Sequence, residues 1–203
     1  FKRLAEKPWL VPAEGGVAQL RTSEFSVHNR KVALMVFLAI AGVLFFLFFA
    51  AYHMRILLST DWVATPEPPL LWINTGVLVV CSIAFEWSRN AAHRGRIEAT
   101  RNAFLVAGVL TLAFLVGQLI VWNQLLAMGY SAEGNPANAF FYLITGVHGV
   151  HLLGGLVAWI RAAVRMRGQV DTTRMRVGVD LCAIYWHFLL FVWVGMLALF
   201  LNT

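Results

Sequence analysis

The apolar residues of this chain are gathered into five long runs separated by polar segments. Each run reaches the roughly 20 residues that a helix needs to cross the hydrocarbon core of a bilayer. Proline and glycine interrupt the helical pattern between runs, notably in TPEPP at 65–69 and AEGNP at 132–136. The predicted spans cover about residues 32–54, 70–88, 102–128, 138–160 and 177–201. The pattern predicts an all-α membrane protein, with an N-terminal tail at 1–31 and a five-helix transmembrane domain at 32–203.

Composition agrees with a membrane protein rather than a soluble one. Of the 203 residues, 60% are apolar and 13% are charged, whereas a soluble domain carries about 25% charged residues. The first 31 residues lack a continuous apolar core that ends at a small-residue cleavage site, so no secretory signal peptide is expected. Both cysteines, Cys81 and Cys182, fall in apolar segments and are expected to be buried, reduced thiols.

Lysine and arginine are distributed unevenly between the two sides of the predicted bundle. The tail holds six, the second loop four and the fourth loop five, whereas Arg55 alone lies on the other side. The positive-inside rule therefore predicts a cytoplasmic N-terminus and a C-terminus on the opposite side of the membrane. The formal charge of +6 is spread between apolar runs, which argues against a nucleic-acid partner. Both outer loops are too short for a catalytic domain, so any chemistry would lie within the bilayer.

The fourth span carries two histidines near the middle of its length. His148 and His151 are three residues apart and share one side of the helix with Thr145. His187 in the fifth span is the only other histidine expected near that depth. Metal binding, proton transfer and bonding between helices are all chemically open to these residues. Bonding between helices is favoured for all four, because no carboxylate lies close by in the sequence. No metal ligand or catalytic residue is predicted in this chain.

Two carboxylates and several arginines are predicted at the inner ends of the spans. Glu86 lies beside Arg89 at the end of the second span, and Asp180 lies one turn into the fifth. Each is interpreted first as an interfacial carboxylate that meets loop arginines, with a proton-related or lipid role as the alternative. The arginines either only set the topology or also hold anionic lipid head groups. The candidates for head-group contacts are Arg89, Arg94, Arg96, Arg161 and Arg165.

Four sequence motifs together resemble one family. NPANAFFYLITGVHGVHLLGG at 135–155 is similar to the motif that precedes and fills the penultimate helix of subunit III of the haem–copper oxidases. YWHFLLFVW at 185–193 resembles the last-helix motif of that subunit. FFAAYH at 48–53 and WINT at 72–75 occupy the matching places in the first two spans. Their order and spacing agree, and the resemblance covers nearly everything after residue 30.

The resemblance implies a cytochrome c oxidase subunit 3 of the short bacterial form, which has five helices where other members have seven. It implies a non-catalytic accessory subunit without haem or copper of its own. It also implies a multi-pass protein of the bacterial inner membrane, with its C-terminus in the periplasm. The haem and copper are expected in the partner subunits. Subunit I is the expected main contact, and it reduces oxygen and pumps protons. Subunit II is expected in the same complex. Bound phospholipid and a role in proton uptake and stability of the complex are also implied.

The match to the family is uneven at its acidic positions. His148, His151 and His187 match family histidines, and Asp180 matches an acidic position of the last helix. However, Ala41 or Gly42 stands where the family commonly has a buried glutamate, and Leu190 replaces an acidic residue in the last helix. The roles of those two carboxylates are therefore not carried over to this chain.

Other functions remain as alternatives to a cytochrome c oxidase subunit. Subunit III of a quinol oxidase and the accessory protein of a nitric oxide reductase belong to the same group of proteins. A free-standing membrane transporter is disfavoured, because five spans do not divide into equal halves and the membrane interior is almost uncharged.

Overall fold

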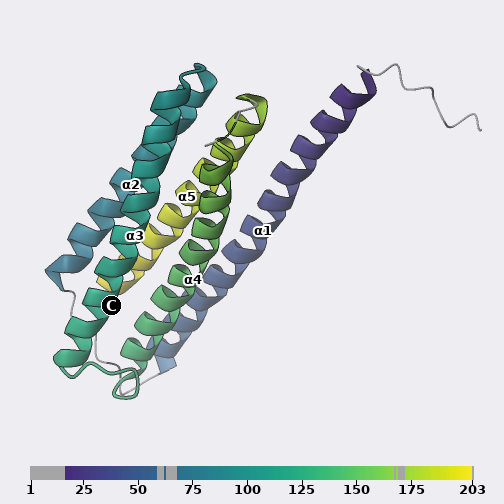
Figure 1. Cartoon of the computed structure of the whole chain (residues 1–203). Helices are drawn as coiled ribbons and strands as arrows, with labels where there is room; N and C mark the ends of the chain where they lie inside the picture. Colours follow the sequence, from purple (N-terminus) through teal and green to yellow (C-terminus); the bar gives the residue numbers. More distant parts are fainter. Residues whose placement is uncertain (1–16, 59–61, 63–67, 167, 169–171, 203) are drawn as a thin grey trace, which may run out of the picture. The chain divides into compact units, whose positions relative to one another are not determined.

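The computed structural model describes residues 17–58, 62, 68–166, 168 and 172–202, with side chains from residue 29 onward (Figure 1). It divides into two units, Phe1–Phe37 and Leu38–Thr203, and each is described by itself. The helices are α1 (Val17–Leu58), α2 (Pro69–His93), α3 (Ile97–Ala127), α4 (Pro136–Arg165) and α5 (Thr172–Leu201). Every one contains a stretch long and apolar enough to cross a membrane, and the described residues form no strand. The predicted all-α membrane fold with five spans is confirmed.

Helix α1 belongs to both units. Within the first unit it begins at Val17, inside the segment expected to be an N-terminal tail. The part suited to crossing a membrane starts at Asn29, close to the predicted residue 32. Residues 1–16 of the predicted tail and residues 65–67 of the predicted TPEPP turn lie outside the described residues.

The other helices run past the predicted spans at their arginine-bearing ends. Helix α2 continues to His93 rather than ending near residue 88, and α3 begins at Ile97 rather than near residue 102. Apolar length marks where the hydrocarbon ends, whereas helical hydrogen bonding continues until the backbone turns. Gly95 makes that turn with a φ of +72°, which residues with a side chain rarely adopt. Arg89 and Arg101, expected in a loop, therefore lie on helices.

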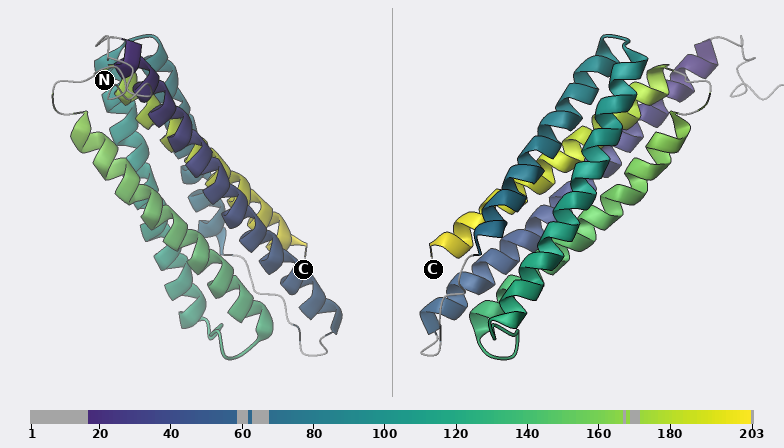
Figure 2. Two further views of the ribbon diagram at one scale, coloured as in Figure 1. Left: turned by 90° about the vertical axis from the view of Figure 1, so that its right-hand side faces the viewer. Right: turned by 60° about the vertical axis from the view of Figure 1, so that its left-hand side comes forward.

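Helices α2 to α5 form a four-helix bundle within the second unit. Helix α2 packs mainly against α3 and α5, and α4 packs mainly against the same two helices (Figure 2). From Leu38 onward, α1 adds contacts to α4 and α5. The Phe45 ring lies 5.3 Å from that of His151, and the Tyr52 ring lies 5.9 Å from that of Phe200. Large side chains that are at most 2% exposed fill the bundle, among them Phe85, Phe104, Phe114, Trp186 and Trp193.

Indole N–H groups join the helices across the bundle. Trp193 donates to Thr75 and Trp186 donates to Thr111, both at 2.9 Å, which joins α5 to α2 and to α3. Each of these threonine hydroxyls also donates to a carbonyl four residues earlier in its own helix, at 2.8 and 3.0 Å. Because lipid is as apolar as leucine, hydrogen bonds and close packing hold helices together in a membrane.

Two glycines let large rings lie directly against a neighbouring helix. A Cβ atom at Gly155 on α4 would lie only 2.5 Å from the ring of Tyr185 on α5. A Cβ atom at Gly108 on α3 would overlap the indole of Trp159 on α4, which donates to the Phe104 carbonyl at 2.8 Å. Such small residues are the usual means by which membrane helices approach one another closely.

Candidate functional site between α2 and α5

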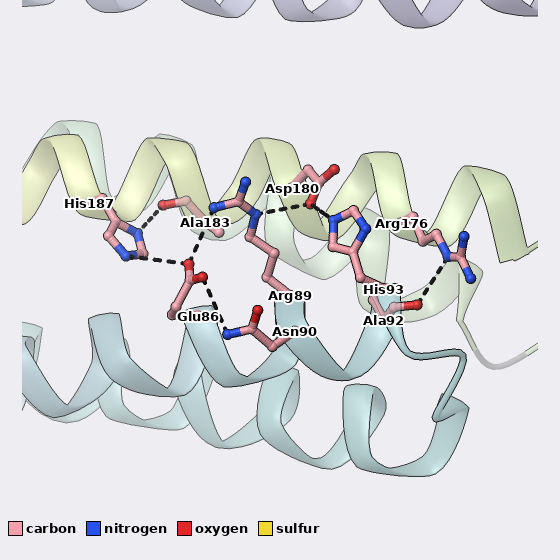
Figure 3. Close-up of polar contacts among 9 residues, drawn as sticks. All are labelled: Glu86, Arg89, Asn90, Ala92, His93, Arg176, Asp180, Ala183 and His187. Carbon is pink, nitrogen blue, oxygen red and sulfur yellow. Dashed lines mark hydrogen bonds and ion pairs between the residues drawn. The ribbon is translucent and has the colours of Figure 1, made fainter.

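Helices α2 and α5 bring two carboxylates together at the arginine-bearing end of the bundle (Figure 3). Arg89 lies between them, with Nε 3.3 Å from Asp180 Oδ1 and Nη1 3.4 Å from Glu86 Oε2. Each carboxylate also faces a histidine. His93 Nε2 lies 3.0 Å from Asp180 Oδ1, and His187 Nε2 lies 3.8 Å from Glu86 Oε2. We call these five side chains the polar network. Three of its contacts join α2 to α5.

Helical spacing explains why these side chains meet. Glu86, Arg89 and His93 lie three and four residues apart on α2, which places them on one face of that helix. Asp180 and His187 lie seven residues apart on α5, which is close to two helical turns. The two faces are directed toward each other, as Figure 3 shows. The regular spacing on both helices therefore builds the polar network.

The two carboxylates differ in their exposure to solvent. The Asp180 side chain is 13% exposed, whereas those of Glu86 and Arg89 are 39% and 41% exposed. A sheltered carboxylate needs a close positive charge, because an uncompensated charge away from water is costly. Arg89 supplies that charge to Asp180. The Glu86 contacts are more open to water, where an ion pair contributes about 0–1 kcal/mol.

A further bond ties α5 to the end of α2. The Arg176 side chain on α5 donates from Nε to the Ala92 carbonyl oxygen at 3.0 Å. This carbonyl belongs to the last turn of α2, where backbone carbonyls lack an intrahelical donor and the helix dipole favours a cation. Arg176 therefore holds this end of α2 against α5 by charge as well as by hydrogen bonding.

An open groove of about 510 Å³ lies beside the polar network. Side chains from α2, from the start of α3 and from α5 line it, together with the turn that contains Gly95. Glu86 and His187 connect it to the polar network, and Arg94 and Arg96 line it from the turn. We call it the α2–α3–α5 groove.

His148 is fully buried and surrounded by aromatic rings. Its ring centroid lies 5.2 Å from Trp193 on α5, 6.1 Å from Phe114 on α3 and 6.2 Å from Phe45 on α1. Neither of its ring nitrogens has a hydrogen-bond partner among the described residues. The interhelix hydrogen bond predicted for His148 is therefore wrong. These rings leave it no acceptor, and the Trp193 N–H is already donated to Thr75.

The other residues expected to bond between helices behave differently from one another. The His151 ring contacts the Val147 carbonyl of its own helix, and its backbone carbonyl accepts from the Tyr185 hydroxyl of α5 at 2.8 Å. His187 contacts Ala183 within α5, and Glu86 of α2 through its second ring nitrogen. Thr145 on α4 accepts from the Trp122 indole of α3 at 3.2 Å and donates to its own helix.

The arginines predicted to contact head groups separate into two sets. Arg89 belongs to the polar network, and Arg94 and Arg96 line the groove. Arg161 and Arg165 lie exposed near the end of α4 and line neither feature. The five arginines predicted to contact head groups therefore do not form a single site.

Two residues of this region were not predicted from the sequence. His93 pairs with Asp180, and Asn90 donates to Glu86 Oε1 at 3.4 Å. Both were assigned to a loop, because the apolar run ends near residue 88. Their four- and seven-residue spacing from Glu86 was the signal that could have placed them on the same helical face.

The arrangement suits charge compensation and proton exchange more than metal binding. In the part of the chain that the structure describes, no three His, Cys, Asp or Glu side chains gather in a way that could hold a metal ion. The histidine–carboxylate pairs are partly exposed, so their protons can exchange with water.

The family model and the relatives that match this chain all belong to one family. The family model described as cytochrome c oxidase subunit III matches residues 14–202. A probable cytochrome c oxidase subunit 3 from Nocardia farcinica is 28% identical over 174 residues, which cover 83% of this chain and 85% of that protein. One from Mycobacterium tuberculosis is 32% identical over 122 residues, or 60% of each chain. Cytochrome c oxidase subunit 3 of Mus musculus is 26% identical over 171 residues, which cover 79% of this chain and 64% of that protein. Because the match to the family model extends over all five helices, this chain belongs to the cytochrome c oxidase subunit III family.

Proposed function

We propose that this chain is a non-catalytic accessory subunit of an oxygen-reducing haem–copper oxidase that receives electrons from cytochrome c. It packs mainly on subunit I, with subunit II in the same complex, in the inner membrane of a bacterium. Haem and copper belong to the partner subunits, where oxygen is reduced and protons are pumped. The family match and the relatives, which are cytochrome c oxidase subunits 3, support this assignment.

The observation that carries the proposal is that buried polar side chains inside the bundle hydrogen-bond to neighbouring helices. Asn74 on α2 donates to Gln118 on α3 at 3.2 Å, and both are buried. Trp186 and Trp193 likewise donate their indole N–H groups to threonines on neighbouring helices. Bonds of this kind hold helices together in a membrane. Among the described residues, the buried side-chain polar atoms without a partner are Trp62 Nε1, Gln118 Nε2 and the two ring nitrogens of His148. This is the arrangement of a scaffold that acts through its surface.

That surface is apolar over the spans. Val43 and Phe46 on α1 are 60% and 68% exposed, and Val109 and Val116 on α3 are 62% and 57% exposed. Under the proposal, such faces contact subunit I and the acyl chains of lipids. Close packing rather than hydrophobic burial would then give the contact with subunit I its stability, because lipid is equally apolar.

The arginine-bearing end faces the cytoplasm in this proposal, and the C-terminus faces the periplasm, as the positive-inside rule requires. The polar network then lies on the side from which the oxidase takes up protons. Its partly exposed histidine–carboxylate pairs exchange protons with water and support that uptake. Arg94 and Arg96, which line the α2–α3–α5 groove at the same end, hold phospholipid head groups.

Purification of the chain from its native membrane in mild detergent tests the proposal. Peptide identification and visible spectra are expected to show that haem-bearing subunits accompany it, and the complex is expected to oxidise reduced cytochrome c. A chain that purifies alone and consumes oxygen would overturn the accessory role. Oxidation of quinol but not of cytochrome c would overturn the choice of electron donor.

A further inference from the structure

The α2–α3–α5 groove has cations that its own side chains do not neutralise. Arg94 and Arg96 line it, and within the described part of the chain neither guanidinium has a hydrogen-bond or ion-pair partner. By contrast, Arg89 and Arg176 on the adjoining helices are both engaged. The φ of +72° at Gly95 forms the short turn that keeps both cations beside the groove. Two unpaired guanidiniums at one opening favour an anion with several oxygens, such as a phosphate.

A carboxylate lies in the same groove. The nearest atoms of Arg89 and Asn90 are each 3.4 Å from a Glu86 oxygen, and His187 is 3.8 Å away. These contacts are long, and the Glu86 side chain is 39% exposed. The carboxylate can therefore accept further N–H donors from a molecule in the groove. An ammonium group supplies such donors together with the opposite charge.

The remaining wall of the groove is apolar and open. Ile83 lies almost one turn before Glu86 on α2 and is 59% exposed, and the adjacent Trp87 is 68% exposed. Ile83 belongs to the apolar part of α2, whereas the arginines lie beyond its end. A groove that runs from cations to exposed apolar side chains matches an amphiphile better than a free anion. Tryptophan at such a boundary is typical of the interface between head groups and acyl chains.

We propose that the α2–α3–α5 groove binds one phospholipid whose head group carries a primary ammonium. Its phosphate lies between Arg94 and Arg96, its ammonium donates to Glu86, and its acyl chains run along Ile83 and Trp87. A primary ammonium donates N–H bonds to a carboxylate, whereas a trimethylammonium has no N–H to donate. The groove thus prefers phosphatidylethanolamine to phosphatidylcholine, and also to phosphatidylglycerol, which has no cation. The inference deepens the lipid contact in the proposed function and rests on its membrane placement, not on the identity of the partner subunits.

The test uses the full complex in nanodiscs that contain equal amounts of phosphatidylethanolamine, phosphatidylcholine and phosphatidylglycerol. Native mass spectrometry after detergent washing then counts the retained lipids and identifies their head groups. Arg94→Gln with Arg96→Gln is expected to weaken retention of phosphatidylethanolamine about 30-fold, since each arginine near a lipid surface contributes about a fivefold factor. Arg161→Gln with Arg165→Gln is the matched control. It removes the same charge from exposed positions outside the groove and is expected to change nothing measurable.

Two further variants separate the head group from the acyl chains. Glu86→Gln keeps the size of the side chain and is expected to abolish the preference for phosphatidylethanolamine over the other two lipids. Ile83→Trp changes no charge but fills the groove, and it is expected to reduce the retention of all three lipids. An unchanged preference in Glu86→Gln would overturn the ammonium contact. Undiminished retention in Ile83→Trp, or an equal loss in the α4 control, would overturn the site.

Visible spectra of the same samples distinguish this inference from the proposed function. If lipid is lost while the haem spectrum stays as in the wild type, the groove binds lipid independently of the contact with subunit I. If the wild-type sample carries no haem but retains phosphatidylethanolamine in this way, the proposed function fails and the lipid site stands.

Discussion

At His148, the packing of the ring stabilises the fold, whereas its buried ring nitrogens destabilise it. The imidazole fills a space between rings from three other helices, and aromatic pairs of this kind contribute about 0.5–1.5 kcal/mol each beyond their buried area. Its two nitrogens have no hydrogen-bond partner among the described residues, and an unsatisfied buried polar group is costly. The ring shape, rather than its hydrogen-bonding capacity, therefore accounts for the contacts that this residue makes.

Replacement by two apolar residues separates these effects. His148→Phe keeps a ring in the same space and is expected to leave the complex as stable as the wild type or up to about 1 kcal/mol more stable. His148→Leu loses the ring contacts and is expected to cost about 1–3 kcal/mol and to loosen the proposed association with subunit I, with little effect on initial turnover. Thermal unfolding and retention of the chain in mild detergent measure both. If Phe were as damaging as Leu, the nitrogens would have a bonding role after all.

Helix α4 shows how a single absent side chain sets the distance between two elements. At Gly155 a Cβ atom would press on the Tyr185 ring of α5, whereas at the adjacent Gly154 it would meet nothing within 4 Å. The two glycines thus differ in role although they are neighbours in sequence. Only the one that faces α5 allows Tyr185 to donate to the backbone of α4.

The pair provides a matched test of helix approach. Gly155→Ala is expected to destabilise the bundle by about 1–3 kcal/mol, the usual cost of overpacking a tight contact. Gly154→Ala is expected to be neutral or to stabilise by up to about 1 kcal/mol, because alanine favours the helix. Thermal unfolding of the two variants in the same lipid is the measurement. Equal effects would mean that α4 and α5 can separate at this point without cost.

Arg89 on α2 joins two helices through a single side chain, because it pairs with Asp180 on α5. Arg89→Met leaves the sheltered Asp180 with His93 as its remaining partner in the polar network, and it is expected to cost about 2 kcal/mol, between the values for exposed and buried pairs. Adding Asp180→Asn removes the uncompensated charge and should recover at least half of that loss. Denaturant unfolding of both single variants and the double variant measures the coupling. Simple additivity would show that Arg89 does not stabilise Asp180.

For the whole molecule, the bilayer is what makes the fold predictable from sequence. A fixed hydrocarbon thickness demands apolar runs of a minimum length, so the number of spans followed directly. Helix ends did not follow, because helical bonding at His93 and Ile97 extends beyond the apolar run. The polar network could be anticipated only in part. Glu86 and Arg89 are close in sequence, whereas Asp180 meets Arg89 only through the packing of α5 on α2.

The direction of insertion can be tested on the same scale. Both native cysteines are buried, at 0% and 6% exposure, so a new surface cysteine can be labelled selectively. Arg94→Cys is expected to react with a membrane-impermeant maleimide in inside-out vesicles, and Gly134→Cys in right-side-out vesicles. The reverse pattern would contradict the orientation given by the positive-inside rule.

The threonines that accept hydrogen bonds from indole N–H groups also affect how a proton could move through the bundle. Thr75 and Thr145 each accept a hydrogen bond from an indole N–H of a neighbouring helix and donate their hydroxyl proton to a carbonyl of their own helix. Thr111 accepts from Trp186 and donates to Ala107 in the same way, and its hydroxyl also contacts Cys81 Sγ at 3.2 Å. A hydroxyl held in both directions cannot rotate to pass a proton onward without breaking a bond. Passing a proton along these hydroxyls would therefore require breaking the hydrogen bonds that join the helices.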